Sequence, residues 1–209
     1  MAPQRKAQQL GIRDEVAALK RSRTIAAAVE LFYEKGYENT TLDAVAERLG
    51  VTKPFIYAHF SSKGELLAEI CSRGIASSLE AMDSVLPLKA SPTEKLRVLG
   101  ERFVRAVLTS QMHIAIFSRE EKNLAVADFN RINDMRRDFD RKLTALLREG
   151  IEAGEFHVSD AHMAALAIGG MVSWAYVWYR PDGRLSLDEV VDRMALLILD
   201  MVNADTGKG

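Results

Sequence analysis

Side chains that suit contact with a DNA duplex are concentrated between residues 52 and 63. On a helix through this segment, Ile56 and Phe60 lie one turn apart and mark the buried face. The side chains left outside are Thr52, Lys53, Phe55, Tyr57, Ala58 and His59. Lysine, histidine and hydroxyl groups bind phosphate oxygens, and apolar groups such as Phe55 contact thymine methyl groups. The segment is therefore a candidate nucleic-acid surface.

Catalytic and metal-binding patterns are missing from the sequence. The four histidines (His59, His113, His157 and His162) have no zinc-ligand spacing, and there is neither a glycine-rich phosphate loop nor a nucleophile elbow. Glu120 and Glu121 are adjacent on a helix, so their carboxylates do not converge. The single cysteine, Cys71, excludes an internal disulfide and fits a reducing cytoplasm. We expect no enzymatic activity, no metal and no cofactor.

A short helix and a tight corner position the outward residues. Residues 41–49 predict a helix with Leu42, Val45 and Leu49 on one face and a threonine cap at its start. Gly50 follows where a left-handed C-cap is required, because glycine adopts that conformation at little cost. Thr52 then caps the next helix, and a proline occupies its first turn. Two helices joined by a short glycine-containing turn predict a helix-turn-helix, whose second helix enters the major groove.

The same region resembles a known family. The resemblance rests on residues 31–37 (LFYEKGY), 40–41 (TT), 50–53 (GVTK), 57–60 (YAHF) and 62–65 (SKGE). The segment from about residue 21 to 67 is similar, without a gap, to the DNA-binding domain of TetR-family repressors. The residues expected to contact DNA are Arg23, Thr40, Thr41, Thr52, Lys53, Phe55, Tyr57, His59 and Lys63.

The charge distribution agrees with a DNA-binding N-terminal head. The net charge is −1, but residues 1–63 hold ten basic against seven acidic side chains. A basic excess in this segment is the electrostatic footprint of duplex binding. We expect a basic flexible tail over residues 1–13, which meets the DNA backbone or is merely frayed. The three-helix head then covers 14–61, a ligand-binding and dimerisation body 62–203, and a disordered tail 204–209.

The body shows helical periodicity throughout, so the expected fold class is all-α. A long helix from Ser62 to about residue 85 begins with a capping box, and further helices are expected over about 92–108, 113–119, 126–153, 160–179 and 187–201. Residues 160–179 are apolar nearly all round, so both faces need a cover. The longest apolar run within it, Met163 to Trp178, is shorter than the roughly 20 residues of a membrane span and contains two glycines and a serine.

The last two helices predict a homodimer. Small side chains on residues 160–179 let helices approach closely, and a four-helix seam with a second copy would cover the exposed face. The residues expected in this seam are Ala167, Gly170, Ser173, Met194, Leu197 and Ile198. Two copies would present two recognition helices to a palindromic operator in double-stranded DNA.

A ligand cavity is expected inside the body. Its expected lining and anchors are Phe103, His113, Phe117, Arg119, Phe129, Arg136, Phe139, Met171, Trp174 and Trp178. A ligand there would tilt the helix that begins at Ser62 and change the spacing of the heads. Residues 116–122 and 178–186 are also similar to segments of TetR regulators of lipid, steroid and aromatic-acid breakdown, which implies an acyl-CoA effector. The alternatives are a sensor of hydrophobic drugs and an architectural DNA binder.

Overall fold

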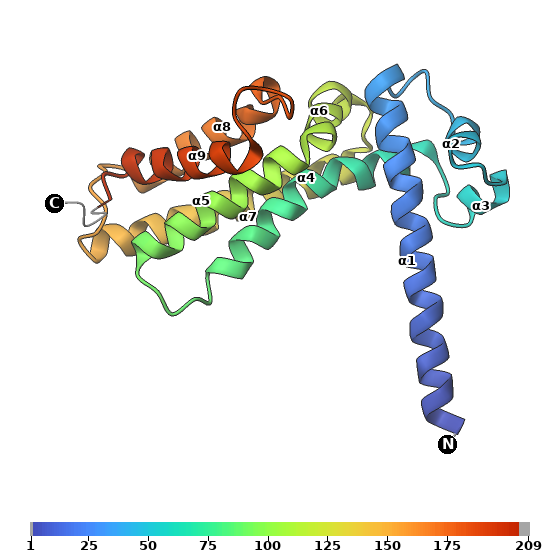
Figure 1. The fold of residues 1–209 in the computed structure, drawn as a ribbon, viewed down its shortest axis with the longest axis horizontal. Coiled ribbons are helices and arrows are strands. Elements are labelled where there is room, and N and C mark those ends of the chain that lie inside the picture. The colour runs from blue at the N-terminus through green and yellow to red at the C-terminus, as the bar shows by residue number, and fades with distance from the viewer. Residues whose placement is uncertain (1, 205–209) are drawn as a thin grey trace. The chain divides into compact units, whose positions relative to one another are not determined.

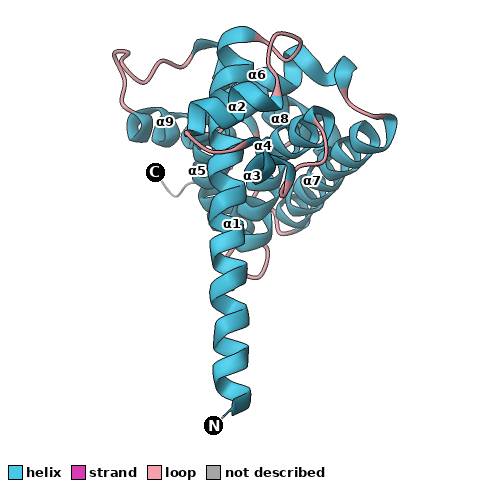
Figure 2. Ribbon diagram, turned by 90° about the vertical axis from the view of Figure 1, so that its right-hand side faces the viewer, coloured by secondary structure: helices cyan, strands magenta, loops and turns pink. Residues whose placement is uncertain are grey.

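The computed structural model describes the backbone of residues 2–204 and the side chains of residues 14–204. Figures 1 and 2 show that this part of the chain is built from helices and loops, with no strand, as expected for an all-α fold. In chain order the elements are α1 (Ala2–Lys35), α2 (Leu42–Leu49), α3 (Lys53–Tyr57), α4 (Lys63–Val85), α5 (Pro92–Thr109), α6 (Gln111–Glu120), the 3-10 turn η1 (Glu121–Asn123), α7 (Val126–Glu152), α8 (Ala161–Trp178) and α9 (Leu187–Met201).

The chain forms two compact units. Unit 1 contains the residues up to Ile70 together with residues 116–125, and unit 2 contains residues 71–115 and those from Val126 onward. The head expected over residues 14–61 is thus part of a unit that reaches further along the chain and includes the end of α6. Helix α4 contributes its first eight residues to unit 1 and the rest to unit 2.

Unit 1 is organised around the packing of α1 against α2 and of α2 against α3. The side chains of Ile25, Phe32, Val45, Ile56 and Phe60 are almost completely buried and form its core. Helix α1 begins at Ala2, so the backbone of residues 2–13 is helical where a flexible tail was expected. The expected C-terminal tail, apart from Ala204, lies outside the described residues.

The corner between α2 and α3 has the predicted geometry. The Thr41 hydroxyl accepts a hydrogen bond of 3.1 Å from the Ala44 N–H and so caps α2. Gly50 has φ +65° and ψ +34°, the left-handed conformation that favours glycine. Thr52 occupies the N-cap position of α3, but its side chain makes no cap hydrogen bond, which corrects the expectation of a capping hydroxyl.

Unit 2 is built around α5, which contacts α7, α8 and α9. Figure 1 shows α9 lying along α5. The buried core includes Phe103, Phe139, Leu143, Ala165 and Ile198. The capping box predicted at Ser186 and Glu189 is present, because the Ser186 hydroxyl accepts from the Glu189 N–H and the Glu189 carboxylate accepts from the Ser186 N–H.

Helix α8 is the most apolar element of unit 2. It is the one helix in the described part of the chain that is long and apolar enough to cross a membrane, judged by length and composition only. About 28% of its residues are buried in the structure, and half of its 18 residues are exposed. Within the described residues, the outward face of α8 is left without a cover.

Candidate DNA-binding surface and ligand cavity

Helix α3 exposes the side chains that suit DNA contact. Thr52, Lys53 and Tyr57 are exposed, with Tyr57 54% accessible. Phe55 and His59 are half-buried, and their rings meet edge to face at a centroid distance of 5.5 Å. The Lys20 ammonium of α1 lies 5.6 Å from the Phe55 ring. The segment thus offers a cation, hydroxyl groups and an aromatic edge on one surface.

Lys53 and Arg21 connect this surface to α2 and α1. The Lys53 ammonium lies 2.5 Å from the Asp43 carboxylate, which ties α3 to α2. The Asp43 carboxylate accepts a hydrogen bond from this ammonium and so raises the pKa of Lys53. Arg21 of α1 donates a hydrogen bond of 2.7 Å to the His59 carbonyl and lies 4.2 Å from the Phe60 ring centroid. Arg21 therefore fastens α1 to the segment that follows α3.

Thr40 does not belong to this surface, which corrects the sequence-based expectation. Its side chain is fully buried, and its hydroxyl donates to the Gly36 carbonyl at 2.9 Å. A buried hydroxyl that is already bonded inside the protein cannot reach a phosphate. Thr41, the next residue, is exposed, although its hydroxyl is occupied by the α2 cap. Arg23 on α1 is exposed as expected.

A shallow hollow lies between the starts of α2 and α4. It has a volume of about 310 Å³ and is lined by Thr40, Thr41, Leu42, Asp43, Tyr57, Ser61, Ser62 and Lys63. The Lys63 ammonium donates to the Tyr37 carbonyl at 2.9 Å and lies 4.1 Å from the Tyr37 ring centroid. The same ammonium donates to the Glu38 carbonyl at 3.5 Å, so contacts with the loop before α2 position it beside the hydroxyl groups of the hollow.

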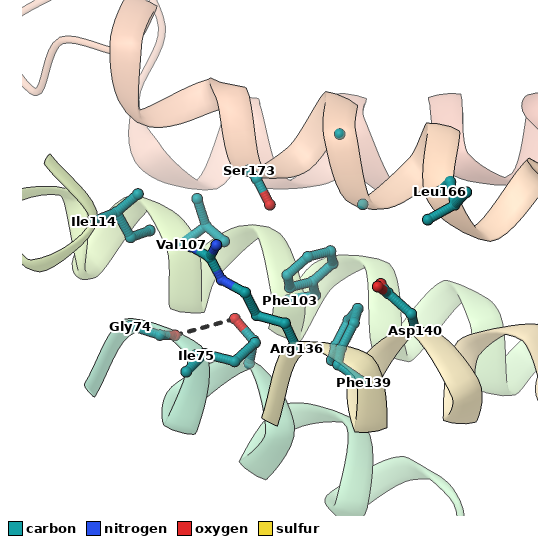
Figure 3. A pocket seen from close by; sticks show the side chains of 13 residues that line it. Gly74, Ile75, Phe103, Val107, Ile114, Arg136, Phe139, Asp140, Leu166 and Ser173 are labelled. Atoms are coloured by element: carbon teal, nitrogen blue, oxygen red, sulfur yellow. Dashed lines mark hydrogen bonds between the residues drawn. The ribbon is translucent and has the colours of Figure 1, made fainter. Parts of the chain in front are cut away.

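A cavity of about 320 Å³ opens within unit 2. Its lining is Gly74, Ile75, Ser78, Phe103, Val107, Ile114, Arg136, Phe139, Asp140, Leu166, Gly169, Gly170 and Ser173. Phe103, Arg136 and Phe139 were predicted to line a cavity, while Gly170 and Ser173 were predicted for the dimer seam. Figure 3 shows Arg136 and Asp140 pointing from α7 toward the cavity, opposite Ser173 of α8. The lining is mainly apolar, with a few polar groups that orient a ligand.

Seven of the predicted cavity residues lie elsewhere. Phe117 and Arg119 belong to unit 1, where the Arg119 guanidinium lies 4.9 Å from the Tyr33 ring centroid. Trp174 and Trp178 are exposed on α8. The cavity lining also leaves out His113, Phe129 and Met171. His113 is half-buried, and burial together with the charge of Arg73 lowers its pKa.

Asp140 is the one charged residue of the cavity lining that was not predicted from the sequence. It is half-buried on α7, and burial raises the pKa of its carboxyl group, while His162 and Arg136 oppose the increase. An acidic residue on a helix crowded with charges looks like part of a solvated face. The one available signal was its position three residues before the buried Leu143 and one after the buried Phe139.

Helices α8 and α9 each have an exposed apolar stripe. On α8 the exposed residues include Met163, Leu166, Ala167, Gly170, Ser173, Trp174, Val177 and Trp178. On α9 they include Leu196, Leu197 and Met201. Met194 and Ile198, which were predicted for the dimer seam, are 4% and 1% exposed and pack inside the subunit. They are unavailable to a partner because the inner face of α9 covers α5.

No group of histidine, cysteine, aspartate and glutamate residues among those described is arranged to hold a metal ion. The features that remain are a helix-turn-helix with exposed polar residues and a separate helical body with a cavity. Together they define the class of one-chain regulators that couple a DNA-binding head to a ligand-binding body.

The chain belongs to the TetR family of bacterial regulators. The family of bacterial regulatory proteins named after tetR matches residues 25–70, and the tetracyclin repressor-like C-terminal domain matches residues 89–202. It is therefore a DNA-binding transcriptional regulator. The suspected resemblance is confirmed, and the match covers both the head and the body.

Individual relatives extend over nearly the whole chain. The HTH-type transcriptional repressor KstR2 of Mycolicibacterium smegmatis is 25% identical over 210 residues, 99% of this chain and 98% of the relative. The structure of the TetR-family regulator PfmR from Thermus thermophilus aligns with a TM-score of 0.77 and 32% identity, over 85% of this chain and 97% of that one. AibR, solved with isovaleryl coenzyme A and operator DNA, aligns with a TM-score of 0.73 and 25% identity, over 85% and 97%.

Proposed function

We propose that the protein is a homodimeric transcriptional repressor of the cytoplasm, which binds a palindromic operator and is released by a small-molecule effector, with acyl-CoA thioesters as the effector class. The observation that carries the effector part is the cavity of unit 2, whose apolar wall includes Phe103 and Phe139 and whose polar groups include Arg136. Its volume of about 320 Å³ lies within the range of small-molecule sites. The relative AibR is solved with an acyl-CoA and operator DNA.

The operator-binding part rests on α3. Its exposed Lys53 and Tyr57 contact phosphates, and the edge of Phe55 contacts bases. Arg23, Thr41, Thr52, His59 and Lys63 supply further contacts around it. A single helix of five residues reads few base pairs, so two copies are needed for a specific site.

The dimer part rests on the outward stripes of α8 and α9. Trp174 is 62% exposed, Met163 59%, Leu196 52% and Leu197 50%, an unusual amount of large apolar surface for two neighbouring helices. A second copy that docks the same two helices buries both stripes around a two-fold axis. Gly170 has open space where a Cβ would lie, so a partner helix can approach closely there.

Helix α4 supplies the route from effector to operator. Lys63, at its start, lines the hollow of the head, and Gly74, Ile75 and Ser78 of the same helix line the cavity. A ligand that binds one orientation of α4 better than another shifts the population of head spacings by that difference in affinity. Operator affinity falls when the favoured spacing no longer matches the half-sites.

A second candidate effector class is hydrophobic cationic drugs. The observation that favours it is Asp140, a half-buried carboxylate in the cavity wall that would pair with a ligand cation. Arg136 in the same wall opposes this pairing.

The experiment has two stages. Selection from random duplexes identifies an operator, and a palindromic consensus supports the repressor, whereas uniform affinity with a steep salt dependence indicates an architectural binder. A thermal-shift panel then compares coenzyme A thioesters with cationic dyes. Stabilisation by the thioesters alone supports the proposal, and stabilisation by the dyes alone contradicts its effector class.

A further inference from the structure

A second hollow lies beside the cavity in unit 2, and one side chain lines both. This hollow, here called the arginine groove, has a volume of about 350 Å³ and is lined by Arg137, Asp140, Arg141, Thr144, Arg148 and His162. Asp140 also lines the apolar cavity. The two hollows are therefore neighbours that meet at Asp140.

The groove is built by one face of α7. Arg137, Arg141 and Arg148 are spaced by four and seven residues, so their side chains line one face of the helix. His162, in the first turn of α8, completes the wall. Three guanidinium groups in a row form a surface that suits an extended anion, because each presents several donors in a planar fork.

Arg137 and Arg141 of the groove form exposed ion pairs, which leave their guanidinium groups able to bind a phosphate. Arg137 pairs with Asp134 at 3.0 Å, and Arg141 pairs with Asp138, in both cases three residues earlier on the same helix. The Arg137 and Arg141 side chains are 78% and 72% exposed. Exposed ion pairs of this spacing contribute little stability, and a phosphate that binds two of the arginines outcompetes them.

The Asp140 carboxylate restricts which ligand groups can lie where the two hollows meet. A Cβ on Gly169 of α8 would lie 3.9 Å from the Asp140 Oδ1, so the carboxylate faces the gap between α7 and α8. Figure 3 shows it at the cavity wall, on the same helix as Arg136. A second carboxylate at this point is disfavoured by charge repulsion, whereas a neutral group with an N–H donor is accepted.

The chemistry of the two hollows matches the two ends of a coenzyme A thioester. Its acyl chain is apolar, its thioester is neutral, its pantetheine arm carries amide N–H groups, and its nucleotide end carries phosphates. A free fatty acid places its carboxylate near Asp140 and has nothing for the groove. A cationic drug is repelled, because the two linings together contain four arginines and one aspartate.

We propose that the cavity and the arginine groove form one effector site, in which Arg137, Arg141 and Arg148 bind the phosphates of a coenzyme A thioester and Asp140 excludes free carboxylic acids. The inference rests on the proposed function and assigns the residues that select the effector.

The test uses three ligands that share one acyl chain: the coenzyme A thioester, the pantetheine thioester without the nucleotide, and the free acid. Hexadecanoyl and octanoyl series are titrated into the full-length protein by calorimetry. The groove variant is Arg141→Gln with Arg148→Gln. Its control is Arg131→Gln, a change on the same helix at a residue that pairs with Asp128 at 3.2 Å and lines neither hollow.

The groove variant is expected to weaken coenzyme A thioester binding at least about tenfold and to leave pantetheine thioester binding unchanged, since two charge-assisted phosphate contacts are lost. The Arg131→Gln control binds all ligands as the wild type does. A groove variant that binds the coenzyme A thioester within about twofold of the wild type overturns the phosphate assignment.

Asp140→Asn tests the selection against acids. It is expected to raise the affinity for the free acid, relative to that for the coenzyme A thioester, about fivefold or more, because a like charge is removed from beside the acid carboxylate. Equal effects on both ligands overturn the selective role. Wild-type protein that binds no thioester contradicts the proposed effector class itself, while wild-type binding with unresponsive variants contradicts only the groove and Asp140.

Discussion

The Lys63 ammonium donates a hydrogen bond of 2.9 Å to the Tyr37 carbonyl and lies 4.1 Å from the centroid of the Tyr37 ring. Lys63 begins α4, and Tyr37 follows the end of α1, so this contact fixes the start of α4 to the loop before α2. The same ammonium lines the hollow of the head. A structural contact therefore orients the charge that we assign to a DNA phosphate.

Lys63→Gln separates the two roles of this residue. The amide keeps N–H donors for hydrogen bonding, but the positive charge is lost. Operator affinity is expected to fall, and the slope of log K against log salt is expected to decrease in magnitude by about 0.9, the value for one phosphate contact. Fluorescence anisotropy over a salt series measures the slope. An unchanged slope would show that Lys63 has no phosphate partner.

Phe55→Ala tests direct readout of bases. Phe55 is half-buried and contacts His59, yet the remaining edge of its apolar ring can meet a thymine methyl. The variant is expected to change the ranking of operator variants, with a loss at one base position of about 1–3 kcal/mol, the usual cost of one mismatched base pair. Tyr57→Ala, which removes an exposed hydroxyl, is expected to weaken all duplexes alike. Equal losses on every duplex for Phe55→Ala would contradict its base-reading role.

Leu197→Glu tests the dimer surface. Leu197 is 50% exposed on α9, so the change is tolerated by the single subunit but places a charge in the seam of the proposed dimer. Sedimentation velocity is expected to show a monomer, with operator affinity lost as well. Ala145→Glu on the exposed face of α7 is the matched control and should remain dimeric. A dimeric Leu197→Glu protein would place the interface elsewhere.

His113 predicts a pH dependence of stability. Burial and the charge of Arg73 lower its pKa in the folded protein, so the unfolded chain binds the proton more readily. The contribution is present above the ordinary histidine pKa of about 6.5 and is lost as the pH falls from there toward the lowered value. Urea unfolding at several pH values measures it. His113→Gln should flatten part of the fall, and an equal fall in both proteins would contradict the assignment.

Features that depend on residues close together in the sequence, such as the corner of the helix-turn-helix and the helix ends, were predicted well. Gly50 is left-handed and Ser186 forms its capping box because both features depend on residues within one turn. The face that a helix buries is harder to predict when it is apolar all round. Trp174, which was expected in the cavity, is exposed on α8. Ile198, which was expected in the dimer seam, packs against the core from α9.

Contacts between distant segments could not be predicted. Phe117 and Arg119 were expected in the cavity, but residues 116–125 fold with the head, where Glu120 accepts a hydrogen bond of 3.3 Å from the Tyr37 N–H. Thr40 looked like a surface hydroxyl, but packing within unit 1 buries it completely, and its hydroxyl donates to the Gly36 carbonyl of the loop after α1. Asp140 was missed for the same reason, because its neighbours come from α8.

The central claim is that an acyl-CoA bound in unit 2 releases the protein from its operator. Fluorescence anisotropy of a labelled operator, selected from random duplexes and saturated with protein, tests it directly when hexadecanoyl-CoA or octanoyl-CoA is added. We expect the thioester to abolish the anisotropy signal of the bound operator. The free acid at the same concentration is expected to leave that signal unchanged. A signal that stays constant, although calorimetry shows the thioester bound, would contradict effector-controlled release.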